Sequence, residues 1–272
     1  MDRETWLLWL LADSQLPTGG FVASAGLEAA LQGGLVRAAA PETEPDSFVA
    51  FIRSSTRNQA RFALPFCSAI HEHAKQLLDG GSSADDDGVA QAVLDEFVRV
   101  DGHHQAMLSS NSVAVRASAA QGGGLLTLFN RGYAHAGFMA DRRGQLCTAI
   151  AKRLQRLART GEIRAHWPTT FGFVCAALGV GLAHTQQLFV FQFVRQLFSA
   201  AIRLNLVGPL RAQALECDMH PAVDDLLKRH GQLRATLTTD DDVFGESAVY
   251  TEPMLELYQG MHDRLYSRIF NS

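Results

Sequence analysis

Histidine is the residue type in this chain best suited to bind a transition metal, because a neutral imidazole nitrogen is a common ligand for nickel and zinc. The sequence contains 10 histidines, of which His71 and His73 flank a single glutamate. The surrounding pattern predicts a helix, and residues two apart on a helix point toward nearly opposite faces. We interpret both as solvated side chains, with a weak surface nickel site shared with a partner chain as the alternative. His166 is interpreted as a capping or packed residue.

The four cysteines lie far apart in the sequence. They are Cys67, Cys147, Cys175 and Cys217. Because no two of them form a Cys-x-x-Cys pair, a structural zinc site of the usual spacing is not expected. Scattered thiols in a chain of 272 residues instead indicate a reducing compartment, and we predict a cytoplasmic location.

Motifs for nucleotide hydrolysis or acyl transfer do not occur in the sequence. A phosphate-binding P-loop needs a Gly-Lys pair, which the chain lacks, and Ser24 has no glycine two residues before it to form a nucleophile elbow. The run Gly122–Gly124 lacks the third spaced glycine of a dinucleotide fingerprint, and we interpret it as a break between helices. We predict that the protein is not an enzyme. The alternative is a helical enzyme with a buried pocket near His166 and Arg203.

The overall charge gives no reason to expect nucleic acid or a membrane surface as a partner. Lysine and arginine number 24 against 28 aspartates and glutamates, so the formal net charge is −4. Residues 165–194 contain no Asp, Glu, Lys or Arg, but the apolar part of this run, 171–183, is too short to cross a bilayer. We predict two buried core helices there.

The elements that must position these residues are helices. Apolar residues recur at helical spacing along most of the chain, and alternating strand patterns are scarce. We predict an all-α protein, a single-domain bundle of roughly ten helices with a C-terminal docking tail. A helical domain covers residues 1–235, a flexible acidic loop covers 236–248, and a C-terminal helix and tail cover 249–272. The expected helices span residues 3–12, 23–33, 46–78, 88–110, 111–120, 125–139, 142–160, 168–183, 186–205, 209–217, 221–235 and 252–264.

Two of these helical segments have an ambiguous outer surface. Residues 142–164 carry seven basic side chains beside an apolar stripe at core-facing spacing. We expect the basic face to be solvated, with a docking strip for an acidic partner as the alternative. Residues 186–204 are apolar on more than one face, so this helix is either buried all round or partly covered by a second subunit.

The most rigid turn expected in the chain follows its first helix. Proline fixes one backbone dihedral, and glycine admits dihedrals closed to other residues, so the sequence Pro-Thr-Gly-Gly has few conformations. A second helix begins directly after this turn. The residues that define this N-terminal motif are Asp13, Ser14, Pro17, Gly19, Gly20, Phe21, Ser24, Gly26 and Glu28.

Three further stretches complete a recognisable pattern. The central stretch His-Trp-Pro-Thr-Thr-Phe-Gly contains His166, Phe171 and Gly172, and a later Ala-Ala-Ile-Arg-Leu contains Arg203. The tail reads His-Asp-Arg-Leu-Tyr-Ser-Arg-Ile-Phe. Together with the N-terminal motif, these stretches resemble the UreF family of urease accessory proteins in order and spacing over the whole chain. The Asn-Leu-x-Gly-Pro sequence after Arg203 is similar to that of eukaryotic members.

The resemblance implies a function in nickel delivery. Members of this family are all-helical homodimers that act as non-catalytic adaptors, or chaperones, in urease maturation. They assemble with the accessory protein UreD, also called UreH, and with the GTPase UreG, and the assembly inserts nickel into apo-urease. The resemblance therefore implies no intrinsic cofactor, with nickel handled by the complex. Regulation of the partner GTPase and direct nickel carriage are the alternatives.

The resemblance also implies that the C-terminal tail helps to dock the UreD-type partner. Its side chains suit an interface, because they combine an apolar stripe with an aromatic anchor and a planar donor fork. These residues are Leu265, Ile269 and Phe270 for the stripe, Tyr266 for the anchor and Arg268 for the fork. Arg203 is a further candidate for partner contact. We expect the tail to be poorly ordered alone and its removal to leave the fold intact; packing on the chain's own core is the alternative.

Overall fold

The computed structural model describes residues 1–37, 47–80, 85–235 and 248–272. Every regular element within these ranges is a helix, which confirms the predicted all-α class. In chain order the elements are α1 (Arg3–Ala12), η1 (Gly20–Val22), α2 (Leu27–Gln32), α3 (Ser47–Phe62), α4 (Leu64–Asp79), α5 (Asp86–Leu108), α6 (Ser112–Arg131), η2 (Tyr133–His135), η3 (Gly137–Met139), α7 (Arg142–Thr160), α8 (Trp167–Leu178), α9 (Leu182–Arg203), α10 (Pro209–Asp218), α11 (His220–His230), α12 (Pro253–Gly260) and η4 (His262–Arg264).

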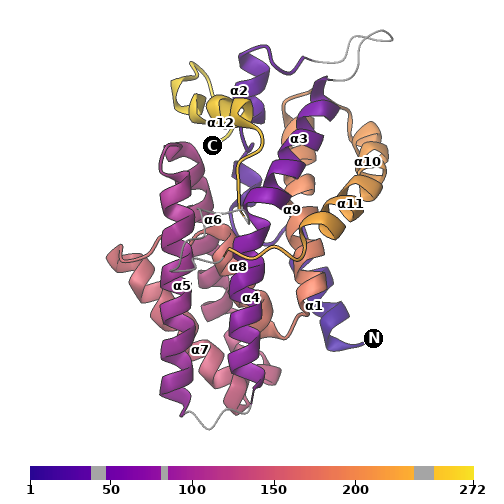
Figure 1. Cartoon of the computed structure of the whole chain (residues 1–272). Coiled ribbons are helices and arrows are strands. Elements are labelled where there is room, and N and C mark those ends of the chain that lie inside the picture. Colours follow the sequence, from indigo (N-terminus) through magenta and orange to yellow (C-terminus); the bar gives the residue numbers. More distant parts are fainter. Residues whose placement is uncertain (38–46, 81–84, 236–247) are drawn as a thin grey trace.

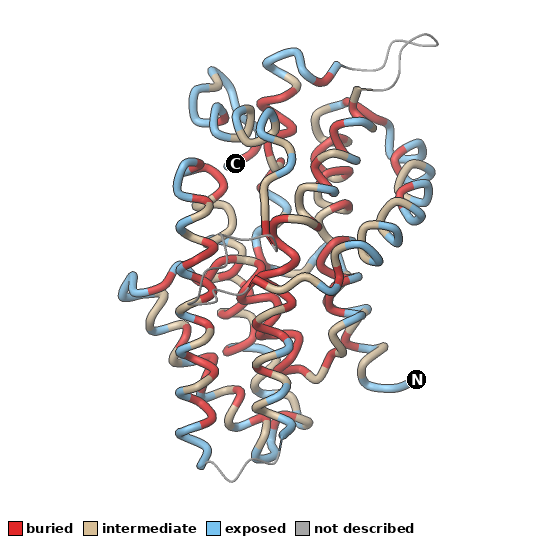
Figure 2. The backbone as a smooth tube through the Cα atoms, in the orientation of Figure 1, coloured by how far each residue is buried: buried red, intermediate tan, exposed pale blue. Residues whose placement is uncertain are grey.

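Helix α8 is the central element of the molecule. It packs against α4, α6 and α9, and each of its residues from Pro168 to Leu178 is buried. Figure 2 shows this buried centre in red. Because α8 is covered on every side, no face of it meets water, and this accounts for the absence of a polar face in its sequence. In the described part of the chain, no helix combines the length and the hydrophobicity that a membrane span would need.

Two groups of buried apolar side chains hold the helices together. The larger core lies among α4, α5, α6, α7 and α8 and contains Phe97 and Phe173, whose ring centroids are 6.5 Å apart. The smaller core lies among α2, α3, α9 and α10 and contains Phe198. Helix α9 reaches both cores, because Phe189 belongs to the larger one. Phe270 of the C-terminal tail also belongs to the smaller core. Figure 1 shows α5 and α7 on one side of α4, with α3, α9 and α10 on the other.

Most of the apolar surface of α9 is covered by the chain itself. Leu188, Val190 and Phe198 are buried, whereas Phe191 is 42% exposed and Phe193 is half-buried. The interpretation of this helix as a core element therefore accounts for most of its apolar residues. A second subunit over α9 stays a prediction.

Helix α6 runs without interruption through the three glycines that were expected to separate two helices. The expected break is wrong because two of these glycines serve close packing. A Cβ atom at Gly122 would lie 1.9 Å from the Ala165 carbonyl oxygen, and one at Gly124 would lie 2.9 Å from the Thr18 carbonyl oxygen. A Cβ atom at Gly123 would meet nothing within 4 Å. Glycine inside a helix costs about 1 kcal/mol relative to alanine, and at Gly123 no contact in the described chain offsets that cost.

Other helix limits differ from those expected for local reasons. The predicted helix over 46–78 is divided into α3 and α4 at Ala63, and Pro65 occupies the first turn of α4, where its missing N–H costs nothing. Helix α5 begins at Asp86, two residues before the expected start, because the Asp85 carboxylate caps it by accepting a hydrogen bond from the Gly88 N–H at 2.8 Å.

The predicted division into a helical domain and a C-terminal tail stays a prediction. Residues 236–247 of the predicted loop lie outside the described residues, and Ala248 is buried. Helix α12 packs against α2 and α6. Figure 1 shows α12 beside α2, although the two helices stand near opposite ends of the sequence.

Candidate functional site: a cradle for the C-terminal tail

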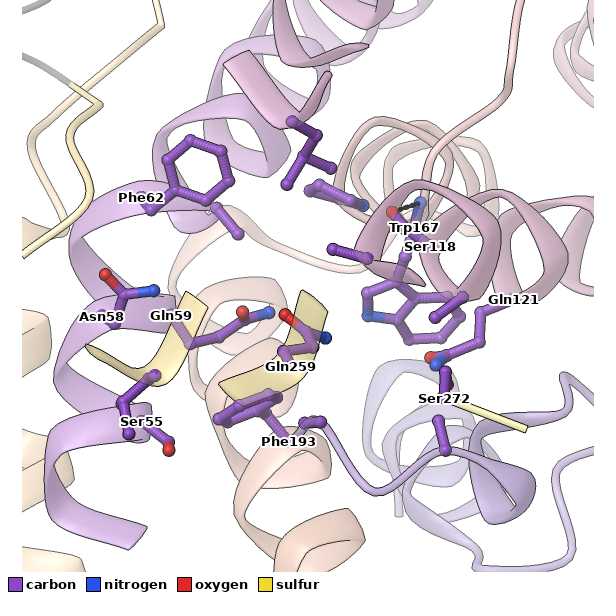
Figure 3. Close-up of a pocket in the computed structure, with 18 of the residues that line it drawn as sticks. Ser55, Asn58, Gln59, Phe62, Ser118, Gln121, Trp167, Phe193, Gln259 and Ser272 are labelled. Atoms are coloured by element: carbon purple, nitrogen blue, oxygen red, sulfur yellow. Dashed lines mark hydrogen bonds between the residues drawn. The ribbon is translucent and has the colours of Figure 1, made fainter. Parts of the chain in front are cut away.

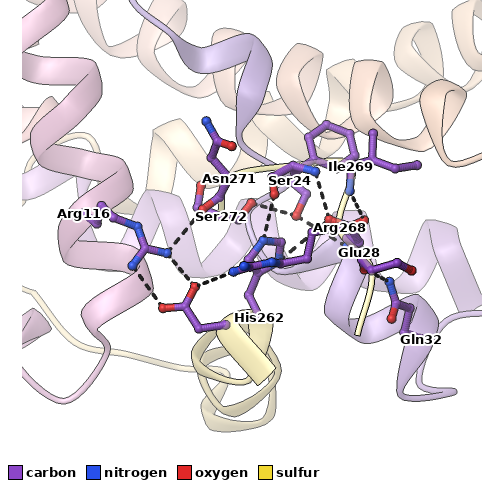
Figure 4. A network of polar contacts seen from close by, with 12 residues as sticks. Ser24, Glu28, Gln32, Arg116, His262, Arg268, Ile269, Asn271 and Ser272 are labelled. Carbon is purple, nitrogen blue, oxygen red and sulfur yellow. Dashed lines mark hydrogen bonds and ion pairs between the residues drawn. The ribbon is translucent and has the colours of Figure 1, made fainter. Parts of the chain in front are cut away.

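The structure brings the N-terminal motif and the C-terminal tail together. We call the contact region the cradle: Val22, Ser24, Glu28, Arg116 and Arg203, which hold residues 262–272 (Figure 4). The turn that shapes it has Gly19 and Gly26 at φ values of 81° and 86°, in the left-handed region that favours glycine. More than 230 residues of sequence therefore separate the two halves of one site.

Backbone hydrogen bonds attach the tail to the cradle. The N–H and the hydroxyl of Ser24 both donate to a Ser272 backbone oxygen, at 2.7 and 2.9 Å. The Glu28 carboxylate accepts hydrogen bonds from the Ile269 N–H at 2.6 Å and the Phe270 N–H at 3.1 Å. Glu28 is 1% exposed, so these charge-assisted bonds are shielded from water. These contacts fix the tail through its main chain.

A second set of polar contacts closes the cradle from the side of α6. The Arg116 guanidinium donates to both carboxylate oxygens of Asp263, at 3.0 and 2.8 Å, and to the Asn271 carbonyl oxygen at 3.3 Å. This arginine holds the pKa of the Asp263 carboxyl below its usual range. Arg268 also donates to Asp263, at 3.1 Å. His262 is buried, and its Nε2 lies 3.1 Å from the Phe270 carbonyl oxygen.

Arg203 joins three of the sequence stretches that the family resemblance singled out. Its guanidinium carbon lies 3.7 Å from the ring centroid of Phe21 and 4.3 Å from that of Phe270, a cation–π sandwich. Its Nε donates to the Ser199 carbonyl oxygen at 3.1 Å, and burial lowers the pKa of the guanidinium. Arg203 therefore clamps the tail against the N-terminal turn, and the predicted contact between Arg203 and a partner stays a prediction.

The tail does not present the apolar stripe that the sequence suggested. Beyond η4 the backbone is not helical, so helical spacing does not gather Leu265, Ile269 and Phe270 on one face. Phe270 is 2% exposed and packs into the smaller core, whereas Ile269 is 65% exposed. The expectation of a tail without its own packing is wrong for Phe270 and His262. Tyr266 is fully exposed and Leu265 is half-buried.

The side chains that the bound tail offers to solvent form a small surface. We call this surface the tail face: Tyr266, Arg268 and Ile269. Glu28 holds the Ile269 N–H, and the Gln32 amide donates to the carbonyl oxygen of Ser267, between Tyr266 and Arg268, at 2.9 Å. Partner contact through these three residues stays a prediction, but the structure leaves them accessible for it.

The central predicted motif belongs to the start of α8 and is held by a carboxylate of α5. Asp101 of α5 accepts hydrogen bonds from the N–H groups of Arg164, Ala165 and His166, at 3.0, 2.9 and 2.7 Å. The same carboxylate accepts the Thr169 hydroxyl hydrogen at 2.7 Å. It thereby satisfies N–H groups at and just before the start of α8, which intrahelical bonds leave free. The sequence signal for this capping role is an aspartate, Asp101, among apolar residues of one helix, and no prediction from the sequence included it.

His166, Phe171 and Gly172 serve packing around that junction. Burial lowers the pKa of His166, whose Nε2 lies 2.9 Å from the Gln105 side-chain oxygen. Phe171 is fully buried, and a Cβ atom at Gly172 would lie 2.2 Å from the Cys67 carbonyl oxygen. These contacts agree with the interpretation of His166 as a packed residue.

The two histidines considered for a metal differ sharply in environment. His71 is fully buried and its Nε2 lies 2.8 Å from the Val180 carbonyl oxygen, so the interpretation of it as a solvated side chain is wrong. The reason is that α4 is covered by α8 on the face that carries His71. Burial also lowers the pKa of His71. His73 is half-buried. Across the described ranges, no group of three or more His, Cys, Asp or Glu side chains is placed to hold a metal ion.

A cavity of about 140 Å³ with a mixed polar and apolar lining lies beside the cradle. Figure 3 shows carboxamides and an indole converging on it, and its lining includes Asn58, Gln59, Gln121, Trp167 and Gln259. A wider groove shares some of these residues and extends to the N-terminal turn and Arg203. The carboxamides of the cavity can donate and accept hydrogen bonds, and the titratable side chains of its lining are His104, Tyr250 and Glu256.

Comparisons with known proteins agree with the resemblance. The UreF family model matches residues 43–220. The chain is 27% identical to urease accessory protein 6 of Cryptococcus neoformans var. grubii, over 99% of this chain and 98% of that protein. It is 30% identical to urease accessory protein F of Arabidopsis thaliana, over 98% of this chain and 92% of that protein. The matched range ends before the tail and begins after the N-terminal turn, whereas these relatives align across both halves of the cradle.

Proposed function

The chain belongs to the UreF family and has an accessory role in urease maturation, and from that membership we propose that it is a non-catalytic adaptor for nickel insertion. In this proposal it binds a UreD/UreH-type accessory protein and the GTPase UreG as a cytoplasmic homodimer. The assembly delivers nickel to apo-urease, with the metal as cargo of the complex. The adaptor brings its partners into register and raises their effective concentration.

The observation that carries the proposal is the cradle. Main-chain bonds from Ser24 and Glu28 hold the tail, so Tyr266 and Ile269 project from an ordered backbone. Tyrosine and arginine are frequent anchors at protein interfaces, and an anchor already in place loses less entropy on binding. A pre-ordered tail face of this kind supports docking of the UreD-type partner.

Point substitutions on the tail face test the proposal better than truncation. Removal of residues 265–272 would also take Phe270 out of the smaller core, so loss of binding would be confounded with loss of stability. Tyr266→Ala and Ile269→Ser change only exposed side chains. We expect the double variant to bind the UreD-type protein about 30-fold more weakly, the effect of losing a hot spot of about 2 kcal/mol. Isothermal titration measures this change.

Leu210→Ala is the matched control, because Leu210 of α10 is an equally exposed apolar side chain outside the tail face. We expect it to leave the affinity unchanged. If the Tyr266→Ala/Ile269→Ser variant binds the UreD-type protein with wild-type affinity, the tail face is not the docking surface. A wild-type chain that binds neither the UreD-type protein nor the GTPase would overturn the adaptor proposal itself.

A further inference from the structure

A groove separate from the cradle runs between α6 and α7. It has a volume of about 390 Å³, and its lining residues are Ala119, Ala120, Gly123, Leu126, Thr127, Gln155, Ala158, Arg159, Ile163 and Arg164. The two helices are joined beneath it, because the Gln155 amide donates to the Thr127 hydroxyl at 3.0 Å and the Asn130 amide donates to the Gln155 side-chain oxygen at 3.3 Å. Its walls are therefore fixed relative to each other.

The floor of this groove consists of small side chains on one face of α6. Ala119, Gly123 and Thr127 follow one another at intervals of four residues, which places them in a row along the helix. Gly123 is the residue of that row without a side chain, and a Cβ atom there would have no described neighbour within 4 Å. Its neighbours Gly122 and Gly124 are needed for contacts with the Ala165 and Thr18 backbones, but Gly123 has no such partner in the described chain. Because Gly123 has no side chain, the backbone of another molecule can come close to α6 at this point.

The rim of the groove is basic, and its cations have no ion-pair partner in the part of the chain that the structure describes. Arg159 and Arg164 line the groove, and three further cations on the same two helices are exposed: Arg131, Lys152 and Arg156. None of these five makes an ion pair with another described residue. The nearest acid in sequence, Glu162, accepts a hydrogen bond from the Thr160 hydroxyl.

Three other arginines of α7 do have acidic partners. Arg142 pairs with Asp86 at 2.8 Å, and Arg153 lies 3.6 Å from Asp87. Arg143 pairs with Asp79 at 2.8 Å and also donates to two carbonyl oxygens at the end of α8. The basic segment thus contains cations that pair with the chain itself and others, among them Arg159, that have no ion-pair partner among the described residues.

We propose that the α6–α7 groove is a docking site for an acidic α-helix of a partner protein. The row of small residues matches the pitch of a helix and admits its backbone, while the arginine forks on the rim suit carboxylates. Charge complementarity makes an acidic partner helix the occupant. The inference rests on the proposed adaptor function, since it supplies that adaptor with a second contact surface apart from the tail face.

The test compares steric and charge variants of the full chain in binding to the UreD-type protein and to the GTPase UreG. Gly123→Leu fills the floor, and Arg159→Glu reverses a rim charge. We expect each to weaken binding of one of the two partners at least tenfold and to leave binding of the other, measured by isothermal titration, unchanged. Gly123→Ala should have a smaller effect than Gly123→Leu. Wild-type affinity for the same partner should fall as salt is raised, because rim pairs are screened.

Two matched controls separate the groove from general effects. Gly102→Leu adds the same side chain to α5 at a glycine where a Cβ atom would also meet nothing, outside the groove. Arg53→Glu makes the same charge reversal on the exposed face of α3. Both should bind like the wild type, and far-ultraviolet circular dichroism should show equal helicity in all five variants.

The outcomes distinguish this inference from the adaptor proposal. If the wild-type chain binds both partners and the groove variants match it, the groove proposal alone is wrong. If Gly123→Leu turns a dimer into a monomer in light scattering without changing either partner affinity, the occupant is a second copy and the acidic-helix proposal is overturned. If the wild-type chain binds neither partner, both proposals are overturned.

Discussion

Two buried carboxylates organise two different regions of this molecule by the same device. Asp101 and Glu28 are each 1% exposed, and each accepts backbone N–H hydrogen bonds from a segment far away in sequence. Asp101 holds the start of α8, a helix whose residues from Pro168 to Leu178 are all buried. Glu28 holds the tail, in which Phe270 is buried and residues 266–269 are exposed. One carboxylate thus fixes a scaffold, and the other fixes a surface that is available to partners.

This difference shows that the burial of a carboxylate does not decide the role of the segment that it holds. Around Asp101 the anchored segment continues into a helix buried on all sides, so nothing is presented outward. Around Glu28 the anchored segment is not helical, and its Phe270 side chain is buried whereas Ile269 is exposed. We expect substitutions at Asp101 to act on global stability and those at Glu28 to act mainly on the tail.

The largest effect should come from Asp101→Ala. It removes the acceptor of three backbone N–H groups and the Thr169 hydroxyl, and leaves those donors buried. We expect the free energy of unfolding to fall by about 4 kcal/mol and the melting temperature by about 10 °C. Chemical denaturation and differential scanning calorimetry measure both. Asp101→Asn, which keeps one side-chain oxygen, should lose less, and equal losses in both variants would contradict this account.

Next in size is the contrast between two adjacent glycines of the scaffold. Gly122→Ala places a methyl group against the Ala165 carbonyl and should lower the free energy of unfolding by about 3 kcal/mol. Gly123→Ala meets open space and should raise it by about 0.5 to 1 kcal/mol through helix propensity. Urea unfolding of the two variants measures this difference in sign. Similar destabilisation by both would show that the α6–α7 groove is not open.

A smaller and more local effect is expected for Glu28→Ala. The Ile269 and Phe270 N–H groups lose their acceptor but can turn toward water, so we expect a loss of about 2 kcal/mol. Amide hydrogen exchange should accelerate at these two residues and remain slow in α8. The Glu28→Ala variant should also bind the UreD-type partner more weakly. Glu28→Gln, which retains an acceptor oxygen, is the control, and uniform acceleration across both regions would erase the distinction between scaffold and cradle.

The smallest effect concerns pH and the scaffold histidines. Burial lowers the pKa of His71, His104 and His166 in the folded chain. The unfolded chain, with pKa values near 6.5, therefore takes up protons that the folded chain does not, so stability is full above about pH 6.5 and falls as pH drops below it. We expect His104→Phe to reduce this loss by about 1 kcal/mol per pH unit. His135→Gln, at an exposed histidine, should not change the slope of stability against pH.

The sequence predicted well those features that depend on local spacing. Helical periodicity indicated the all-α class, and the uncharged run around Phe171 was correctly assigned to the core. Local sequence patterns predicted the structure less well where the group that contacts a residue is far away in sequence. The sequence indicates a surface position for His71, because nothing nearby in sequence shows that α8 covers it. It indicates a helix break at Gly122, because the contact that requires glycine there is with the distant Ala165 carbonyl.

The sequence by itself therefore determined the helices, the absence of a P-loop motif and the family resemblance, because each depends on residues a few positions apart. Only the tertiary structure decided that Ser24 and Glu28 hold a tail more than 230 residues away, that Phe270 faces inward and Ile269 outward, and that Arg159 has no ionic partner within the described ranges. The physical reason is that hydrogen bonds and charges are satisfied in space. A sequence pattern shows which groups need a partner, and folding decides which distant group supplies it.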